Sequence, residues 1–409
     1  MRTRTLLALL VTLGALIGAA WWTSAPGYID VRQIHGADRR PGAVISVEPV
    51  GGHNALILRA MLWWADLPVK VPVADGMTMF RVRYWTDLAG KPVEASGLMA
   101  VPYATLQGRA ARGVVIYLHG TSPDRTNSPS APAVQEGLLP AAIFGGGGYV
   151  LLAPDYIGLG RSHAAQTYLF APATATATRD LLVAARAVAA AMALPQSPDL
   201  YLAGFSQGGH ATAVVQRALE AQPVPGTRVK AAAAISGAFD LAGISLPYAM
   251  RNHHAMYVSY LASSYAQQYH QPLGSLFVPA YAERVPQLFD GDHPVDAILA
   301  ALPKDPHALF LPERLAEFAQ NRANWFTVAL VDNQAWNWAP RAPLRLYFGD
   351  RDKDVSPEDS RHFQAVSARQ GGNVQLVPVG PYDHGTTAFH AVPMARLWFD
   401  GLSLPAGTP

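Results

Sequence analysis

Cysteine is absent from all 409 residues of the sequence. Its absence excludes disulfide bonds, thiolate metal sites, a cysteine nucleophile and a lipid-modified N-terminal cysteine. Charge is scarce and balanced, with 31 Lys and Arg against 29 Asp and Glu and a net charge of +2. Because there is no dense basic cluster, we expect no nucleic-acid partner. The fold must be stabilised by its core alone, for which a hydrophobic content of 50% is ample.

The sequence also lacks the motifs that hold metals and dinucleotides. There is no H-E-x-x-H and no cluster of His and carboxylate residues at metal-ligand spacing, and the pair His253 and His254 is more typical of a surface. The turn at residues 155–162 contains Gly158 and Gly160 but lacks the third glycine that a dinucleotide loop requires. We therefore expect neither a metal ion nor any other cofactor.

The N-terminus has the pattern of an export segment. Arg2 and Arg4 precede an unbroken apolar run, Leu6–Ala20, which is a charged region followed by a hydrophobic region. Small residues allow cleavage after this run, whereas Trp21 and Trp22 could lie at a membrane interface and let the segment persist as an anchor. The shortness of the run favours cleavage. Either way the protein is expected to be exported: secreted or periplasmic, or membrane-anchored with its body outside the cytoplasm.

The remainder of the chain alternates between predicted strands and helices. A hairpin is expected from residues 79–85 and 95–101, where polar and apolar residues alternate. Continuous apolar runs typical of strands buried on both faces follow at 113–118 and 149–153, and further strands are predicted at 201–205, 229–235, 344–348 and 374–379. Helices are predicted at about 131–144, 174–193, 210–221, 357–369 and 386–399. This alternation predicts an α/β fold with a mostly parallel central sheet flanked by helices.

One interval is too long to be a simple crossover. About a hundred residues separate the strand at 229–235 from the strand at 344–348, and a crossover needs little more than a dozen. The excess predicts a mainly helical cap, most of whose aromatic residues form its own core while a minority line an apolar acyl-binding tunnel. The expected divisions are a signal peptide or anchor at 1–25, a core at 26–240 and 341–409, and a cap at 241–340.

A serine follows the strand at 201–205 in a pattern that suits a nucleophile. Gly204-Phe205-Ser206-Gln207-Gly208 reads as the G-x-S-x-G turn between a strand and a helix. Side chains two residues either side of the serine would collide where the strand and the helix close up, so glycine is needed there. The hydroxyl of Ser206 is then expected to stand exposed at the carboxyl edge of the sheet.

A serine nucleophile needs an acid and a base on later strands, in the order Ser, acid, His. Three aspartates follow the strand at 344–348, and Asp352 at the tip of the loop is the preferred acid over Asp350. Asp354 is expected to cap the next helix or to remain solvated.

His384 is the expected base because it follows the last strand, and the adjacent Gly385 would let the backbone approach the nucleophile. His362 and His390 fall within predicted helices and are assigned to the surface or to packing. His210 lies beside the serine on the helix side, where a supporting role is expected.

Stabilisation of an oxyanion requires hydrogen-bond donors near the serine. His119-Gly120-Thr121 leaves the strand at 113–118 as an oxyanion loop would, so the backbone N–H groups of Thr121 and Gln207 are the predicted donors. Gly120 would serve as a permissive hinge, and His119 is expected to pack beneath the loop.

Five motifs in order resemble the α/β-hydrolase superfamily: HGT at 119, PDYIGLG at 154, GFSQGG at 204, GDRDKDVSP at 349 and DHG at 383. Within that superfamily, the alanine-rich helix, the long cap and the upstream YWTD and SGLMAVP stretches look similar to secretory lipases of the lipase A type. The resemblance implies that Ser206 is the nucleophile, Asp352 the acid and His384 the base, with the cap shaping the acyl site. Two departures are the HGT loop, which is closer to that of ordinary esterases, and the lack of the disulfides of fungal members.

The leading hypothesis from the sequence is an exported serine esterase or lipase that acts on a small-molecule or lipid ester through an acyl-enzyme intermediate. A peptidase or an acyltransferase would use the same three residues. A non-catalytic binding protein on the hydrolase fold is the alternative of another class. Contact with a membrane is expected only through the N-terminal segment.

Overall fold

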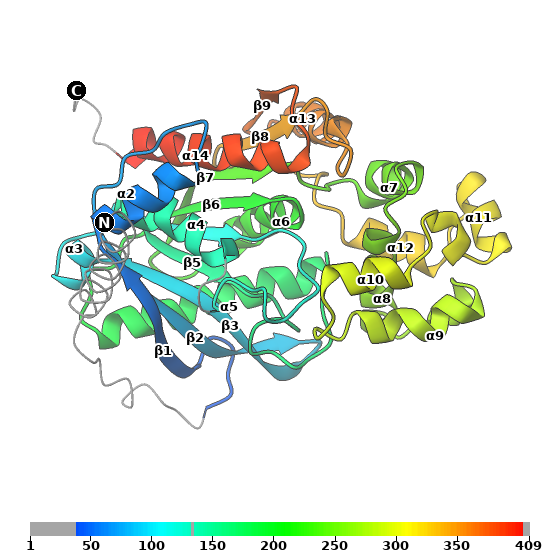
Figure 1. The fold of residues 1–409 in the computed structure, drawn as a ribbon, viewed down its shortest axis with the longest axis horizontal. Coiled ribbons are helices and arrows are strands. Elements are labelled where there is room, and N and C mark those ends of the chain that lie inside the picture. The colour runs from blue at the N-terminus through cyan, green and yellow to red at the C-terminus, as the bar shows by residue number, and fades with distance from the viewer. Residues whose placement is uncertain (1–37, 132–134, 404–409) are drawn as a thin grey trace, which may run out of the picture.

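The computed structural model describes residues 38–131 and 135–403. Within these ranges nine strands form one sheet in the order β1-β2-β3-β5-β4-β6-β7-β8-β9 (Figure 1). Strands β4 to β9 are parallel, and β1, β2 and β3 join them as an antiparallel extension. The strands are β1 (Val44–His53), β2 (Met77–Leu88), β3 (Lys91–Pro102), β4 (Val114–Leu118), β5 (Val150–Pro154), β6 (Asp199–Phe205), β7 (Arg228–Ile235), β8 (Leu344–Gly349) and β9 (Val374–Gly380).

Both faces of the central parallel strands β4 to β8 are buried, whereas β9 at the edge of the sheet has no fully buried residue. Along β6, Leu200 and Leu202 join one core cluster, and Tyr201 and Ala203 join a second cluster on the opposite face. Helices α5, α6 and α13 contribute to the first cluster, whereas α2, α4 and α14 contribute to the second. The prediction of a mostly parallel sheet flanked by helices is confirmed.

Five of the helices that pack around the sheet begin and end close to where the sequence places them, and α2 and α3 were not predicted. The helices around the sheet are α2 (Ala55–Trp64), α3 (Tyr103–Leu106), α4 (Gln135–Phe144), α5 (Ala171–Ala191), α6 (Gln207–Ala221), α13 (Pro357–Arg369) and α14 (His384–Ser403). The sequence pattern left the stretch that forms α2 unassigned. Its N-cap is Asn54, whose side chain accepts a hydrogen bond from the backbone N–H of Ile57.

Residues 241–340, which we call the insertion, are helical and lie beyond one end of the sheet, on the right in Figure 1. Tyr260, Tyr265, Phe277 and Phe326 are buried together in a separate cluster, as predicted for most of the aromatic residues. Its helical segments are a π-helical turn (Leu241–Ser245), α7 (Leu246–Arg251), α8 (Ala255–Gln268), α9 (Pro279–Leu288), α10 (Val295–Ala301), α11 (Pro312–Ala319) and α12 (Trp325–Asp332).

Buried polar groups fasten both ends of the insertion to the sheet. At its start, the carboxylate of Asp359 on α13 accepts hydrogen bonds from the backbone N–H groups of Phe239 and Asp240 and from the hydroxyl of Ser245. At its end, His210 Nε2 lies 2.8 Å from the carbonyl oxygen of Asn333. The helix that follows Ser206 is thereby tied directly to the insertion, which is the supporting role expected for His210.

Among the described residues, no helix has the length and apolar character needed to cross a membrane. The predicted export segment at residues 1–25 lies outside the described residues.

The burial of His210 predicts a loss of stability in mild acid. Burial lowers the pKa of His210 to about 4, whereas its unfolded value is about 6.5. As the pH falls below 6.5 the unfolded chain takes up a proton that the folded chain does not, so stability falls between pH 6.5 and pH 4. His210→Gln should reduce the loss in unfolding free energy between pH 7.5 and pH 5 by about 2 kcal/mol.

Urea denaturation at the two pH values measures this change. The matched control is His163→Gln, because His163 is exposed, and this variant should keep the wild-type pH dependence. An unchanged pH dependence in His210→Gln would show that the buried histidine does not contribute.

Candidate active site

The turn between β6 and α6 holds Ser206 in an unusual backbone conformation. Its φ is 60°, in the left-handed region that L-residues rarely adopt. A Cβ atom at Gly204 would lie 2.2 Å from the carbonyl oxygen of Gly208, and one at Gly208 would lie 1.8 Å from that of Leu118. The steric reason for glycine at both positions is therefore confirmed, and the turn presents Ser206 at the carboxyl edge of the sheet. Ser206 is buried there and not exposed as expected, because residues of the insertion form a pocket over it.

Ser206, His384 and Asp352 come together from the ends of three different strands. Oγ of Ser206 lies 2.8 Å from Nε2 of His384, and Nδ1 of His384 lies 2.7 Å from Oδ2 of Asp352. A carboxylate can only accept, so Nδ1 carries the proton and donates to Asp352. Nε2 is then free to accept a hydrogen bond from the hydroxyl of Ser206. This is the arrangement in which a histidine can act as a general base toward a serine.

Asp352, and not its neighbours, is built into this chain of hydrogen bonds. Its side chain is buried, and Oδ1 accepts from the backbone N–H groups of Asp354 and Val355, at 3.0 and 2.9 Å. Asp350 instead pairs with Arg361 at 3.0 Å. Because both oxygens of Asp352 are engaged, its carboxylate is held in one orientation toward His384.

Asp354 does not cap the following helix. The N-cap of α13 is Ser356, whose hydroxyl accepts from the backbone N–H of Glu358. The Asp354 carboxylate instead lines the pocket beside Ser206, where it accepts a hydrogen bond from the hydroxyl of Tyr257 at 3.3 Å. The expectation that Asp354 acts as a cap is wrong, because a nearer hydroxyl takes the capping position.

The insertion also contacts the loop that carries Asp352. The hydroxyl of Tyr248 donates to the carbonyl oxygen of Asp352 at 2.7 Å, and Nε2 of His254 lies 2.8 Å from that of Lys353. His253 is exposed, as the sequence indicates for the histidine pair, but His254 is not simply a surface residue. The contact between His254 and the acid loop could not be predicted from the sequence, because about a hundred residues separate them.

Carboxylate and imidazole atoms of Asp352, Asp354 and His384 lie within 4.8 Å of one another, a grouping that could in principle ligate a metal. The hydrogen bonds described above already account for both oxygens of Asp352 and for Nδ1 of His384. We therefore assign no metal ion to this grouping.

The two predicted oxyanion donors line the same pocket as Ser206. Gln207 is the first residue of α6, so its N–H has no partner within the helix and lies at the positive end of the helix dipole. Within residues 38–131 and 135–403, neither the Gln207 N–H nor the Thr121 N–H donates to a protein acceptor. Both amides are thus available to a bound group.

Beneath the loop, His119 is fully buried and stacks on Tyr156, with ring centroids 4.3 Å apart. Burial lowers the pKa of His119 to about 4, so the ring is neutral at physiological pH. Its Nδ1 lies 2.8 Å from the carbonyl oxygen of Gly120. These contacts give His119 the packing role that was expected of it.

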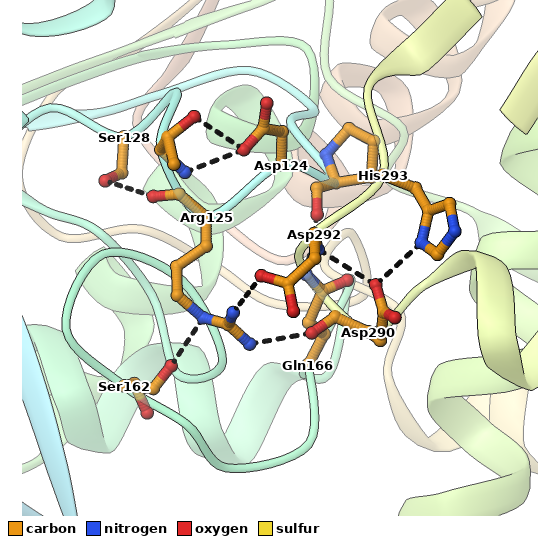
Figure 2. Close-up of polar contacts among 10 residues, drawn as sticks. Asp124, Arg125, Ser128, Ser162, Gln166, Asp290, Asp292 and His293 are labelled. Atoms are coloured by element: carbon orange, nitrogen blue, oxygen red, sulfur yellow. Dashed lines mark hydrogen bonds and ion pairs between the residues drawn. The ribbon is translucent and has the colours of Figure 1, made fainter. Parts of the chain in front are cut away.

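The loop that carries Thr121 is braced by a single arginine (Figure 2). The guanidinium of Arg125 donates to the carboxylate of Asp292, to the carbonyl oxygen of Asp290 and to that of Ser162. The backbone N–H of Arg125 also donates to the carbonyl oxygen of Gly291. The oxyanion loop is therefore fastened to the insertion as well as to the core.

Three further positions differ from expectation. A Cβ at Gly385 would meet nothing within 4 Å, so glycine is not required there for close approach to Ser206. Trp336 and Trp338 pack against the main core and not within the insertion, because they follow its last helix.

The pocket over Ser206 is predominantly apolar. Leu241, Leu246, Ala249, Val258 and Leu261 of the insertion contribute to its walls. Ser245 and Tyr257 of the insertion also line the pocket, and its other lining residues are Thr121, Tyr168, Leu169, Ser206, Gln207, Ala238, Asp354 and Val355. Tyr168 and Leu169 could not be recognised as pocket residues from the sequence, because their stretch before α5 reads only as a loop.

Solved structures with a similar fold cover most of the chain. A protein of Legionella pneumophila provisionally described as a hydrolase is 25% identical, with a TM-score of 0.82 over 90% of this chain and 100% of that chain. The rice cell wall degrading esterase LipA from Xanthomonas oryzae is 25% identical, with a TM-score of 0.75 over 89% and 97%. Candida antarctica lipase A in its closed state is 13% identical, with a TM-score of 0.65 over 94% and 87%, and shows the fold alone.

The sequence matches no protein-family model and no curated protein. The structural neighbours and the sheet topology show that the chain has the α/β-hydrolase fold. Within that fold it resembles the lipase A type, as the sequence motifs indicated. The two neighbours that are 25% identical, described as a hydrolase and an esterase, support a hydrolase.

Proposed function

We propose that the protein is an exported serine hydrolase that cleaves carboxylic esters through an acyl-enzyme intermediate. The observation that carries this proposal is the continuous hydrogen-bonded chain from Ser206 through His384 to Asp352. A serine hydroxyl is a weak nucleophile at neutral pH and becomes reactive only beside such a base. The similarity to an esterase favours ester bonds over the amide bonds of a peptidase.

In the proposed reaction, Ser206 Oγ attacks the ester carbonyl carbon while His384 Nε2 removes the hydroxyl proton. His384 then gives this proton to the leaving alcohol, and Ser206 retains the acyl group. A water molecule, activated by the same nitrogen, releases the acid and regenerates the serine. Asp352 holds the imidazole in the required tautomer and stabilises the imidazolium that forms twice in the cycle.

The backbone N–H groups of Thr121 and Gln207 would stabilise the negative charge that develops on the carbonyl oxygen. Because neither amide donates to an acceptor among the described residues and both are fixed by the surrounding fold, they would need little reorganisation when the charge appears.

We propose that the insertion acts as a cap that shapes the acyl site. Its apolar side chains form one wall of the pocket directly over Ser206. Burial of an acyl chain against these side chains would stabilise the complex in proportion to the apolar area removed from water. The substrate class is therefore a small-molecule or lipid ester with an apolar acyl group.

Export is the part of the proposal that depends on the sequence alone. We propose that residues 1–25 direct the chain out of the cytoplasm, as a signal peptide or as an anchor that contacts the membrane.

The role of Asp352 can be tested by comparing its substitution with the same substitution at Asp350. Asp352→Asn should lower kcat for p-nitrophenyl acetate on the order of a thousandfold or more, because the amide favours the wrong imidazole tautomer. The matched control Asp350→Asn, which loses only an exposed ion pair, should stay within about threefold of the wild type. Ser206→Ala should be inactive in the same assay. Equal effects of the two Asp variants would contradict the assigned roles.

The pocket wall predicts the response to acyl length. Ala249→Phe should narrow the pocket and lower kcat/KM for p-nitrophenyl octanoate by about tenfold relative to p-nitrophenyl acetate. Ala300→Phe makes the same change at an exposed site on α10 and should leave the ratio of kcat/KM for p-nitrophenyl octanoate to that for p-nitrophenyl acetate unchanged. A ratio that is equal in both variants would show that acyl chains do not occupy this pocket.

A further inference from the structure

Two hydroxyl groups meet at the wall of the pocket over Ser206. Oγ1 of Thr121 lies 3.1 Å from the phenolic oxygen of Tyr168, and either atom could be the donor. Thr121 and Tyr168 both line the pocket together with Ser206 and Gln207. The side chain of the residue that offers one oxyanion amide is therefore in direct contact with a tyrosine that the proposed reaction does not use.

The hydrogen bond between these groups leaves one proton without a partner. The pair has two hydroxyl protons, and only one of them can lie between the two oxygens. Within the described residues, neither oxygen has a second hydrogen-bond partner. Since the surrounding wall is largely apolar, the acceptor that could satisfy the second proton is an oxygen atom of a bound substrate.

Tyr168 is held so that it cannot turn away from Thr121. Its ring stacks on Tyr260 with centroids 4.1 Å apart and an angle of 5°, and Tyr260 stacks in turn on Phe289 at 4.5 Å and 4°. The hydroxyl of Tyr260 also lies 3.5 Å from the carbonyl oxygen of Ser122, next to Thr121. This column of rings joins the oxyanion loop to the core of the insertion.

The chemistry of the two groups sets the direction of the hydrogen bond. A phenol is more acidic than an aliphatic alcohol and is the better donor, whereas the threonine oxygen is the better acceptor. Burial raises the pKa of Tyr168 to about 12, so the phenol keeps its proton throughout the neutral range. Tyr168 is buried and Thr121 is only partly buried, which leaves the threonine hydroxyl closer to incoming groups.

We propose that Tyr168 is a positioning residue of the oxyanion hole: its phenol donates to Thr121 Oγ1 and turns the threonine hydroxyl proton toward the substrate oxygen. Thr121 then offers two donors, its backbone N–H and its hydroxyl, in addition to the N–H of Gln207. No proton is transferred in this step, because the phenol only fixes the rotation of the threonine hydroxyl. The inference rests on the proposed ester hydrolysis and assigns a residue to it.

The test is a double-mutant cycle on Thr121 and Tyr168, with kcat and KM measured for p-nitrophenyl acetate. Thr121→Val removes the hydroxyl but keeps the amide and should lower kcat by about 100-fold, whereas Thr121→Ser should retain activity within a few fold. Tyr168→Phe should lower kcat by about tenfold with little change in KM, because a freely rotating hydroxyl remains a partial donor. The double variant should be no slower than Thr121→Val.

Tyr265→Phe is the matched control. Tyr265 is as buried as Tyr168, but its hydroxyl donates to the carbonyl oxygen of Leu169 and does not contact Thr121. This variant should keep the wild-type kcat. A second readout is the inhibition constant of a trifluoromethyl ketone, which forms an oxyanion in the pocket and should bind more weakly to Tyr168→Phe.

The inference is overturned if Tyr168→Phe keeps kcat within twofold, if it raises KM alone, or if the two single effects multiply in the double variant. It is also overturned if Thr121→Ser is as slow as Thr121→Val. Fluorophosphonate labelling of the wild type distinguishes this failure from failure of the proposed function, because labelling needs Ser206 and His384 but neither hydroxyl.

Discussion

The backbone turn at Ser206 is the constraint on which the rest of the site depends. Its left-handed conformation is imposed by the close packing of α6 against β4 and β6, which leaves no room for a Cβ at Gly204 or Gly208. This turn places the hydroxyl beyond the sheet and the N–H of Gln207 beside it. A strained local conformation is therefore held by the large buried core on both sides of the sheet.

The partners of Ser206 arrive through the sheet topology, and the insertion then stabilises them. The order of β6, β8 and β9 brings the loops that carry Asp352 and His384 to one edge. Tyr248 of the insertion contacts the loop that carries Asp352, and Arg125 of the oxyanion loop contacts Asp290 of the insertion. The insertion thus both lines the pocket and contacts the loops that carry Asp352 and Thr121, so under the proposed function binding of an acyl chain and alignment of the site would be coupled.

Much of this arrangement could be predicted from the sequence because the signals are local. Each candidate site residue lies within a few residues of the carboxyl end of a predicted strand, and a helix was predicted at about 357–369, the bounds of α13. Long-range contacts left no such signal. Tyr168 lies in a loop without periodicity, and its partner Thr121 is 47 residues away. The capping choice between Asp354 and Ser356 depends on a loop path that composition does not determine.

Covalent labelling of the folded protein by a fluorophosphonate, followed by mapping of the modified residue, tests directly whether Ser206 is an activated nucleophile. We expect complete labelling of the wild type at Ser206 and none in Ser206→Ala, because only a serine activated by His384 reacts. Absence of labelling in the folded wild type, or labelling that persists in Ser206→Ala, would contradict the proposed role of Ser206.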